Sequence, residues 1–225
     1  MVTSKRKYDK FDTYIERVLK HLYPELGMTS EAKMEVNNLI KASFQKIMDA
    51  VNYLNAQSDK KTISAKHLGI TTDMVLGKEL AKHARQEGTR AVTEYNTSVS
   101  SSQGKSDTTT TRSERAKLIF PVGRIENTWI RPAMCGRDTR LSEDAPVYMA
   151  AVLEYITADI LELAGHVAKD DKKMRITTRH LALALQRDDE LDHFLGDYIV
   201  SGGVVPHIHS ALLLKKKTRK KKTDA

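Results

Sequence analysis

The sequence has little that would support a disulfide-bonded, membrane-bound or sheet-rich protein. It contains one cysteine, Cys135, so no internal disulfide can form, and this cysteine usage is typical of a reducing, intracellular compartment. No apolar run approaches the ~20 residues that span a bilayer, and no apolar stretch of a secretory signal follows the charged N-terminus. Only five prolines and eleven glycines interrupt the 225 residues, which favours long helices. We therefore expect a soluble, helical, intracellular protein without a membrane-bound part.

Positive charge is concentrated near the C-terminus. The formal net charge is +8, and residues 215–222 (KKKTRKKK) carry seven basic side chains and no acidic one. With Asp224 counted, this tail carries +6, so the remaining residues carry only 8 − 6 = +2. A body that is nearly neutral can bind a polyanion only if its basic and acidic side chains lie on separate surfaces.

Apolar residues recur at helical spacing in the first part of the chain. They predict a short helix at 11–23, and then a long helix of about 27 residues that Thr29 or Ser30 caps. Two further helices are predicted at 64–76 and 78–95, the first of them capped by a serine. The first part is therefore predicted to contain short, long and short helices followed by a fourth.

The same order is predicted again after a polar stretch. Residues 96–111 are rich in Ser, Thr, Gly and Gln, which indicates a flexible linker. A short helix is then predicted around 124–130 and a long one at 146–169, with a proline in its first turn. A third helix is predicted from a Thr177 cap to about Arg187.

A local match shows that the chain contains a duplicated unit. Residues 63–68 (ISAKHL) parallel residues 176–181 (ITTRHL) at an offset of 113 residues (176 − 63). The recurrence of His67 and His180 predicts a structural role for both. One unit cannot cover the apolar stripe of its own long helix, whereas two units clasped around crossed long helices can. The predicted fold is therefore all-α, an intramolecular pair of short-long-short units.

Several stretches resemble core histones. Residues 80–84 (LAKHA) and 87–93 (EGTRAVT) resemble the C-terminal helix of 2B-type histones. Residues 120–124 (FPVGR), 145–155 (APVYMAAVLEY) and 202–206 (GGVVP) resemble the start of the fold, the long helix and the docking segment of 2A-type histones. The chain thus resembles a fused core-histone doublet, 2B-type followed by 2A-type, like the histone doublets of giant DNA viruses (Marseillevirus-like).

The resemblance implies two histone folds that form an intramolecular pseudo-heterodimer. It implies a 2B-type fold with its C-terminal helix at 1–95, a linker at 96–111, a 2A-type fold with docking segment at 112–214 and a basic tail at 215–225. Such a protein would be a core component of nucleosome-like particles that wraps and compacts double-stranded DNA without sequence specificity. Its partners would be histone 3 and histone 4-type histones or their fused doublet. It would lie in chromatin, in a host nucleus, and in a viral factory and virion if it is viral.

DNA contact in this fold uses loops, helix N-termini and arginines that enter the minor groove. Arg140 and Arg175 match those arginines, with Arg137 as the alternative to Arg140 because this loop is about three residues longer than the 2A pattern. We interpret residues 215–222 as a contact with linker DNA, with nuclear import and solubility as alternatives. The residues to which the resemblance assigns DNA contact are Thr29, Ser30, Lys60, Lys61, Thr62, Arg112, Arg115, Arg124, Arg140, Lys173, Arg175 and Thr177.

The resemblance also implies two protein-binding surfaces. An acidic patch is expected to bind arginine-bearing peptides, because a guanidinium pairs bidentately with carboxylates; an ordinary solvated helix face is the alternative. The acidic patch comprises Glu79, Glu87, Glu154, Asp159, Glu162, Asp188, Asp189 and Glu190. The docking segment, expected to bind a histone 3-type partner, comprises Gly202, Gly203, Val204, Val205, Pro206, His207 and Ile208.

No catalytic, cofactor or metal site is expected. His207 and His209 have no cysteine or carboxylate cluster nearby to complete a metal site, and Cys135 has no activating partner at useful spacing. Residues 104–106 (GKS) resemble the end of a P-loop but lack its first glycine and a preceding strand. The alternative function is a histone-fold transcription factor or chromatin-remodelling subunit, which the docking segment and the complete acidic patch disfavour.

Overall fold

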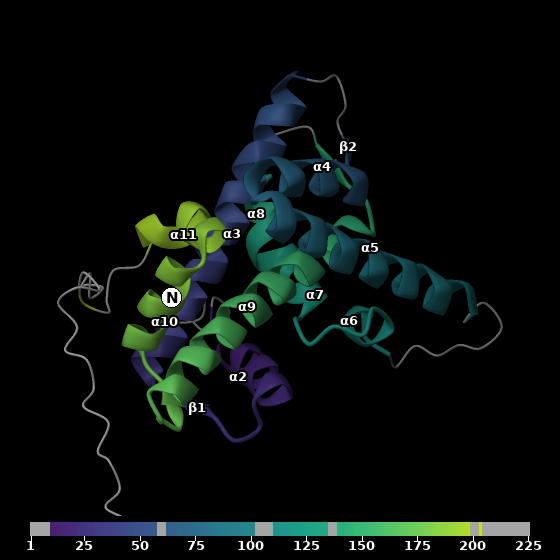
Figure 1. Cartoon of the computed structure of the whole chain (residues 1–225). Helices are drawn as coiled ribbons and strands as arrows, with labels where there is room; N and C mark the ends of the chain where they lie inside the picture. Colours follow the sequence, from purple (N-terminus) through teal and green to yellow (C-terminus); the bar gives the residue numbers. More distant parts are fainter. Residues whose placement is uncertain (1–9, 58–61, 102–109, 135–138, 199–202, 204–225) are drawn as a thin grey trace, which may run out of the picture.

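A computed structural model describes residues 10–57, 62–101, 110–134 and 139–198, together with Gly203 (Figure 1). Within these residues, no helix is long and apolar enough to cross a bilayer. Several residues singled out from the sequence lie outside the described ranges. They are Lys60, Lys61, Cys135, Arg137, Gly202, Val204, Val205, Pro206, His207, Ile208, His209 and the basic tail at 215–225.

The first part of the chain forms the four predicted helices. They are α2 (Asp12–Leu22), α3 (Ser30–Gln57), α4 (Ala65–Val75) and α5 (Lys78–Ser101). The first three agree with the predicted bounds within two residues, because an amphipathic stripe and a capping residue define each of them. The short-long-short order expected from the sequence is confirmed for this part.

The fourth helix is longer than predicted. The helix α5 continues to Ser101, so residues 96–101, which were expected within the flexible linker, are helical. Thr97 donates its hydroxyl to the carbonyl of Thr93 at 2.8 Å, and Ser100 to that of Asn96 at 2.9 Å. These bonds satisfy polar side chains inside the helix, and no glycine or proline interrupts this stretch. The polar composition of residues 96–101 therefore did not prevent them from forming a helix.

The second part repeats the order, with one irregular helix. The predicted helix at 124–130 extends over residues 122–133 and contains a π-helical turn, followed by Pro132 within the helical stretch. A wider turn relieves the clash between a proline ring and the preceding turn. The elements are α6 (Arg112–Arg115), α7 (Val122–Ile125), the π turn η1 (Glu126–Ile130), α8 (Arg131–Ala133), α9 (Ala145–Asp170), α10 (Thr178–Arg187), α11 (Asp189–Leu195) and the 3-10 turn η2 (Gly196–Tyr198).

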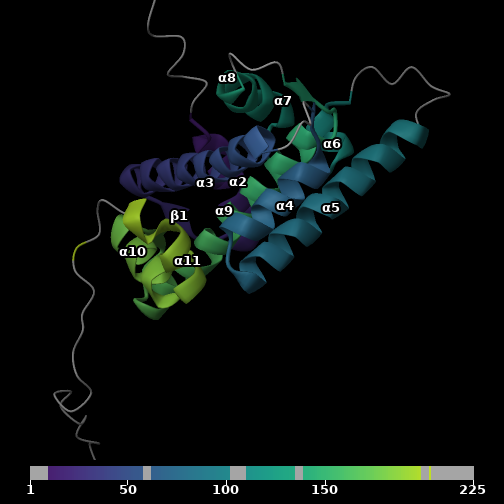
Figure 2. The same ribbon diagram turned by 90° about the horizontal axis from the view of Figure 1, so that it is seen from above.

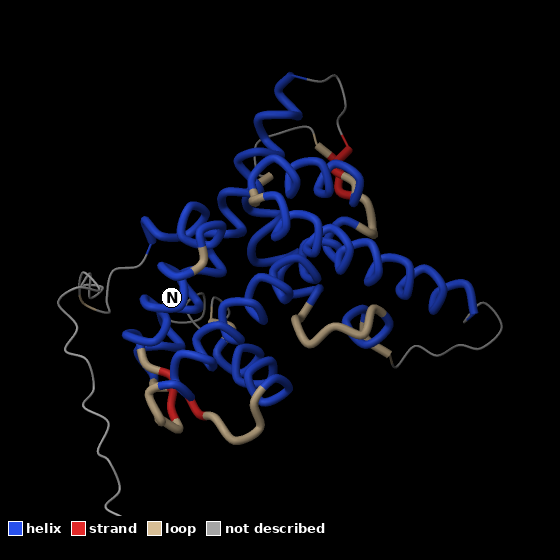
Figure 3. Tube along the Cα trace, in the orientation of Figure 1, coloured by secondary structure: helices blue, strands red, loops and turns tan. Residues whose placement is uncertain are grey.

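Two short parallel strand pairs join the halves at opposite ends of the molecule, as the red segments of Figure 3 show. The strand β1 (Gly27–Met28) pairs with β4 (Arg175–Ile176), and β2 (Thr62–Ile63) pairs with β3 (Arg140–Leu141). The offset of 113 residues relates β1 to β3 (140 − 27) and β2 to β4 (175 − 62). Each strand therefore pairs with the non-equivalent strand of the other half, so the two halves are joined reciprocally.

The recurring histidines have the structural role that was predicted. The Ser64 backbone N–H donates to His67 Nδ1 at 3.3 Å, and the Thr177 N–H donates to His180 Nδ1 at 3.2 Å. In each case the histidine closes a capping box at the start of a short helix.

The two halves share one core, in which α9 crosses α3 (Figures 1 and 2). The helix α9 also packs against α2, α4 and α5 of the first half. An aromatic cluster lies across the boundary, with the ring of Trp129 centred 4.6 Å from Phe11 and 5.2 Å from Phe44. Because buried side chains of each half contact the other, the halves form one hydrophobic unit.

The helices α5 and α9 pack closely together at Gly88. A Cβ atom added there would lie 2.5 Å from the ring of Tyr148, so only glycine fits. The Tyr148 side chain is 3% exposed, and its hydroxyl has no hydrogen-bond partner among the described residues. Burial raises the pKa of Tyr148 to about 12. The ring is thus held between the halves by close packing.

Candidate nucleic-acid interface and acidic patch

One strand pair brings Arg175 next to the start of the long helix of the other half. Arg175 is exposed and pairs with Gly27 in the β1–β4 ladder. The Thr29 backbone N–H donates to the carbonyl of Ile176 at 3.0 Å, and Thr29 Oγ1 accepts the N–H of Ala32. The N-terminus of α3, at Ser30, and that of α10, capped by Thr177, therefore both lie beside Arg175. Lys173 is exposed in the preceding loop.

The second strand pair builds an equivalent end. Arg140 is exposed and pairs with Thr62 in the β2–β3 ladder. Both the backbone N–H and the hydroxyl of Ser142 donate to the carbonyl of Ile63, at 2.9 and 3.0 Å. Helix α4 begins directly after β2, and α9 begins shortly after β3. Each end thus presents an exposed arginine between two helix N-termini, where partial positive charge favours anions.

The three remaining arginines assigned to DNA lie on α6 and α7, between the strand pairs in the view of Figure 1. Arg112 forms an ion pair with Glu126, and Arg115 Nε donates to Thr110 Oγ1 at 3.2 Å. Arg124 lies 5.2 Å from the centre of the Tyr14 ring. These side chains are held by contacts with other residues of the protein.

Glu190 connects the halves within the acidic patch. Its two carboxylate oxygens accept the backbone N–H groups of Glu79, at 3.2 Å, and of Leu80, at 2.8 Å. These backbone bonds hold the pKa of Glu190 below its usual value. A Cβ atom on Gly77 would lie 2.9 Å from this carboxyl, so the missing side chain makes room for it. Glu190 therefore caps the helix α5 of the other half.

A group of acidic side chains surrounds Asp159. Burial, followed by the charges of Asp188 and Glu162, raises the pKa of Asp159 to about 6. The charge of His83, on α5, acts in the opposite direction. Burial and these carboxylates also raise the pKa of Tyr155, to about 12. The carboxylates of Asp159 and Glu162 on α9 and of Asp188 at the α10–α11 junction thus lie near one another, and His83 of α5 lies beside them.

Not every residue of the acidic patch offers a free carboxylate. Glu154 accepts the backbone N–H of Phe120 at 2.8 Å, and its pKa is raised mainly by burial. Glu87 pairs with Arg90 at 2.5 Å. Asp189 is exposed at the start of α11. Glu154 thus holds the segment before α7 in place, and Glu87 is partly neutralised.

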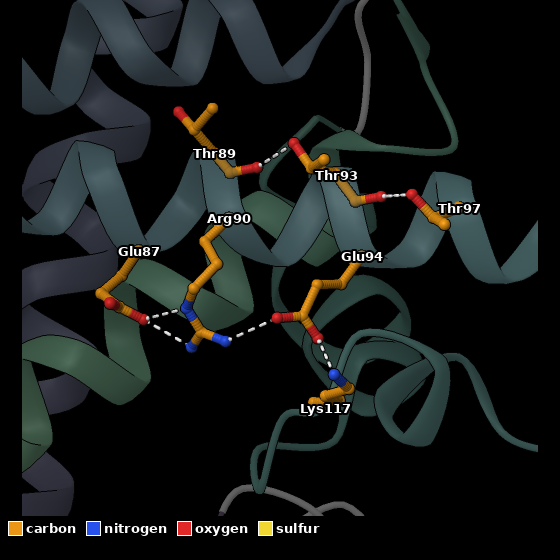
Figure 4. A network of polar contacts seen from close by, with 7 residues as sticks. All are labelled: Glu87, Thr89, Arg90, Thr93, Glu94, Thr97 and Lys117. Carbon is orange, nitrogen blue, oxygen red and sulfur yellow. Dashed lines mark hydrogen bonds and ion pairs between the residues drawn. The ribbon is translucent and has the colours of Figure 1, made fainter.

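A polar network that was not singled out from the sequence joins α5 to the second half (Figure 4). Arg90 lies between Glu87 and Glu94, and Glu94 forms a further ion pair with Lys117 at 3.0 Å. The pKa of Glu94 is lowered first by its bond with Lys117. The spacing of Glu87, Arg90 and Glu94 along one helix face could have indicated the first pairs, but Lys117 is too distant in sequence.

The described part of the chain contains no group of three or more His, Cys, Asp or Glu side chains that could hold a metal ion. Its chemistry is that of two exposed arginine-bearing ends and one acidic cluster.

Comparison with known families agrees with these features. Residues 99–187 match the core histone domain that histones 2A, 2B, 3 and 4 share, and residues 189–222 match the C-terminus of histone 2A. The chain belongs to the core histone family. Its second half is of the 2A type, and members of this family are structural proteins of chromatin, not enzymes.

Relatives from fungi and plants match the second half. The 2A.Z histone of Eremothecium gossypii is 56% identical over 110 residues, which cover 48% of this chain and 81% of the relative. The 2A.Z histone of Saccharomyces cerevisiae is 56% identical over 103 residues, 46% of this chain and 75% of the relative. A probable 2A-type histone of Arabidopsis thaliana is 50% identical over 123 residues, 54% and 90% of the two chains.

Proposed function

We propose that this chain is a fused histone doublet that wraps double-stranded DNA without sequence specificity. In this proposal residues 1–95 are a 2B-type fold, 96–111 the linker region, 112–214 a 2A-type fold and 215–225 a basic tail. The protein would assemble with histone 3 and histone 4-type histones, or with their fused doublet, into a nucleosome-like particle. It would lie in host chromatin, and in the viral factory and virion if the chain is viral.

The reciprocal pairing of four strands at an offset of 113 residues is the observation that carries the proposal. It supports two equivalent units arranged about an approximate two-fold axis. The same strand pairs contain the two arginines that are expected to enter minor grooves, Arg175 at one end and Arg140 at the other. Contacts of this kind bind phosphates and narrow minor grooves without reading bases.

A DNA-wrapping assay tests this function. The double variant Arg140→Ala/Arg175→Ala should weaken wrapping of unrelated DNA sequences to a similar degree. It should also lower the slope of affinity against salt by up to ~2 in log–log units, because each lost phosphate contact removes ~0.9. The matched control is Lys82→Ala/Arg187→Ala, which removes the same charge from two exposed residues outside the strand pairs.

The result is read on particles assembled with histones 3 and 4 and digested with nuclease. Equal effects of the two double variants would contradict a specific role for the strand-pair arginines. Protection confined to particular sequences would favour the alternative function, a transcription factor or remodelling subunit. The docking segment is proposed to bind the histone 3-type partner, and its deletion should abolish assembly of the particle.

We further propose that the acidic patch binds arginine-bearing peptides. Support comes from Asp159, whose pKa is raised by burial and then by the nearby charges of Asp188 and Glu162. The double variant Asp159→Asn/Glu162→Gln should abolish binding of such a peptide and leave DNA wrapping intact. It spares Glu154 and Glu190, whose carboxylates accept backbone N–H groups. Unchanged peptide binding, or a loss of DNA wrapping, would contradict the proposal.

A further inference from the structure

Two arginines from different elements bind one buried carboxylate. Arg112 Nη2, on α6, lies 2.5 Å from Glu126 Oε2. Arg131 Nη2 and Nε, on α8, lie 2.5 and 3.0 Å from Glu126 Oε1. The Glu126 side chain is 8% exposed, whereas those of Arg112 and Arg131 are 33% and 62% exposed. The negative charge is therefore covered, and the two guanidinium groups reach the surface.

In the cluster of Arg112, Glu126 and Arg131, the carboxyl group stays ionised and the two guanidinium groups have more N–H donors than Glu126 accepts. Burial opposes the charged form of Glu126, but the bonds and charges of Arg112 and Arg131 outweigh it and hold the pKa below its usual value. Two positive groups on one negative group leave a net charge of about +1. A guanidinium has five N–H donors, and Glu126 takes one from Arg112 and two from Arg131. Among the described residues, the printed bonds to Glu126 leave further N–H donors on both arginines.

The π-helical turn brings Arg131 over Glu126. These residues are five apart, and in a regular α-helix they would point about 140° away from each other. In η1 the backbone N–H of Arg131 bonds to the carbonyl of Glu126, so five residues complete one turn and both side chains lie on one face. A turn of this kind is rare and is often found at functional sites.

We propose that Glu126 is a positioning residue that holds Arg112 and Arg131 as a paired phosphate-binding site. This inference rests on the proposed DNA wrapping and adds Arg131, which is exposed and was not singled out from the sequence. Guanidinium groups bind phosphate bidentately when their planes are fixed. Because Glu126 fixes both planes before DNA arrives, less side-chain freedom is lost on binding.

The substitution Glu126→Gln distinguishes two roles of Glu126, a negative charge near DNA and a group that positions the arginines, because the two roles predict opposite effects on DNA binding. Glu126→Gln removes a negative charge next to DNA, so charge alone would strengthen DNA binding. If Glu126 positions the arginines, Glu126→Gln should instead weaken binding by about twofold or more, as expected for a lost charge-assisted pair. The matched control is Glu114→Gln, at an exposed position of α6. The amide oxygen of the new glutamine can still accept the Thr111 N–H. This control should bind DNA as well as the unchanged protein or better.

Substitutions of the exposed Arg131 test the same site without touching a buried group. Arg131→Ala should lower the salt slope by ~0.9, and Arg131→Lys should weaken binding although it keeps the charge. Helicity and thermal unfolding are measured for each variant to confirm that it is folded. If Glu126→Gln strengthens binding as Glu114→Gln does, or if Arg131→Ala leaves the slope unchanged, the inference is overturned. If Arg140→Ala/Arg175→Ala also leaves wrapping unchanged, the proposed function itself fails.

Discussion

The contact between Gly88 and Tyr148 predicts that Gly88→Ala, which adds one methyl group, lowers the free energy of unfolding. Alanine favours a helix over glycine by about 1 kcal/mol, so Gly88→Ala would stabilise α5 if nothing opposed it. The new Cβ would lie 2.5 Å from a ring carbon of Tyr148, well inside contact distance, and the ring is 3% exposed. Overpacking of this kind costs about 1–3 kcal/mol. Because the ring cannot swing into solvent, we place the steric cost at the upper end, about 3 kcal/mol.

The net destabilisation is then about 2 kcal/mol, which lowers the Tm by roughly 4–8 °C for a chain of this size. Urea unfolding followed by circular dichroism measures the change in the free energy of unfolding, and thermal unfolding measures the change in Tm. Gly69→Ala is the matched control, because its Cβ would lie 3.4 Å from the Tyr148 hydroxyl and needs little movement. This control should be neutral or stabilising. If Gly88→Ala proves as stable as the unchanged protein, the close packing of α5 on α9 is not as described.

Three further predictions concern the pairing of the halves and the side chains of Asp159 and Tyr148. The purified chain should be a folded monomer in light scattering, because its linker gives an effective concentration of order millimolar; a swapped dimer at low micromolar concentration would contradict this. The folded-state pKa of Asp159 is raised to about 6, so the stability it contributes is present below its ordinary value and is lost as pH rises through 6. Asp159→Asn should therefore raise stability at pH 7 and flatten the pH profile. Tyr148→Phe should be neutral or slightly stabilising, because it removes a buried hydroxyl that has no hydrogen-bond partner among the described residues.

The regular parts of this fold were predictable from the sequence for a simple reason. The long helices bury continuous apolar stripes, and local capping residues such as Thr177 define where several helices begin. The 113-residue repeat predicted the intramolecular pair, and the strand pairs have the same offset. His67 and His180 were assigned a structural role because they recur, and both close capping boxes.

The parts that were missed depend on irregular turns and distant partners. Arg131 was overlooked because periodicity at 3.6 residues per turn does not relate residues five apart, as the π turn does. Arg112 is fourteen residues from Glu126, so their pairing left no local signal. Glu154 and Glu190 were identified by charge as members of the acidic patch, but charge does not reveal that backbone N–H groups occupy their carboxylates. These contacts arise only when separate segments pack together.

The reciprocal strand pairs have a consequence for how the proposed nucleosome-like particle would be remodelled. Each end of the molecule contains one strand from each half, so neither half can leave without breaking both ends. Both halves also belong to one polypeptide, which fixes their ratio at one to one from the moment of synthesis. In the proposed particle, this chain would be inserted or removed only as a whole, whereas separate subunits can be exchanged one at a time for variant forms. Turnover of one half alone would require cleavage of the chain between Ser101 and Thr110.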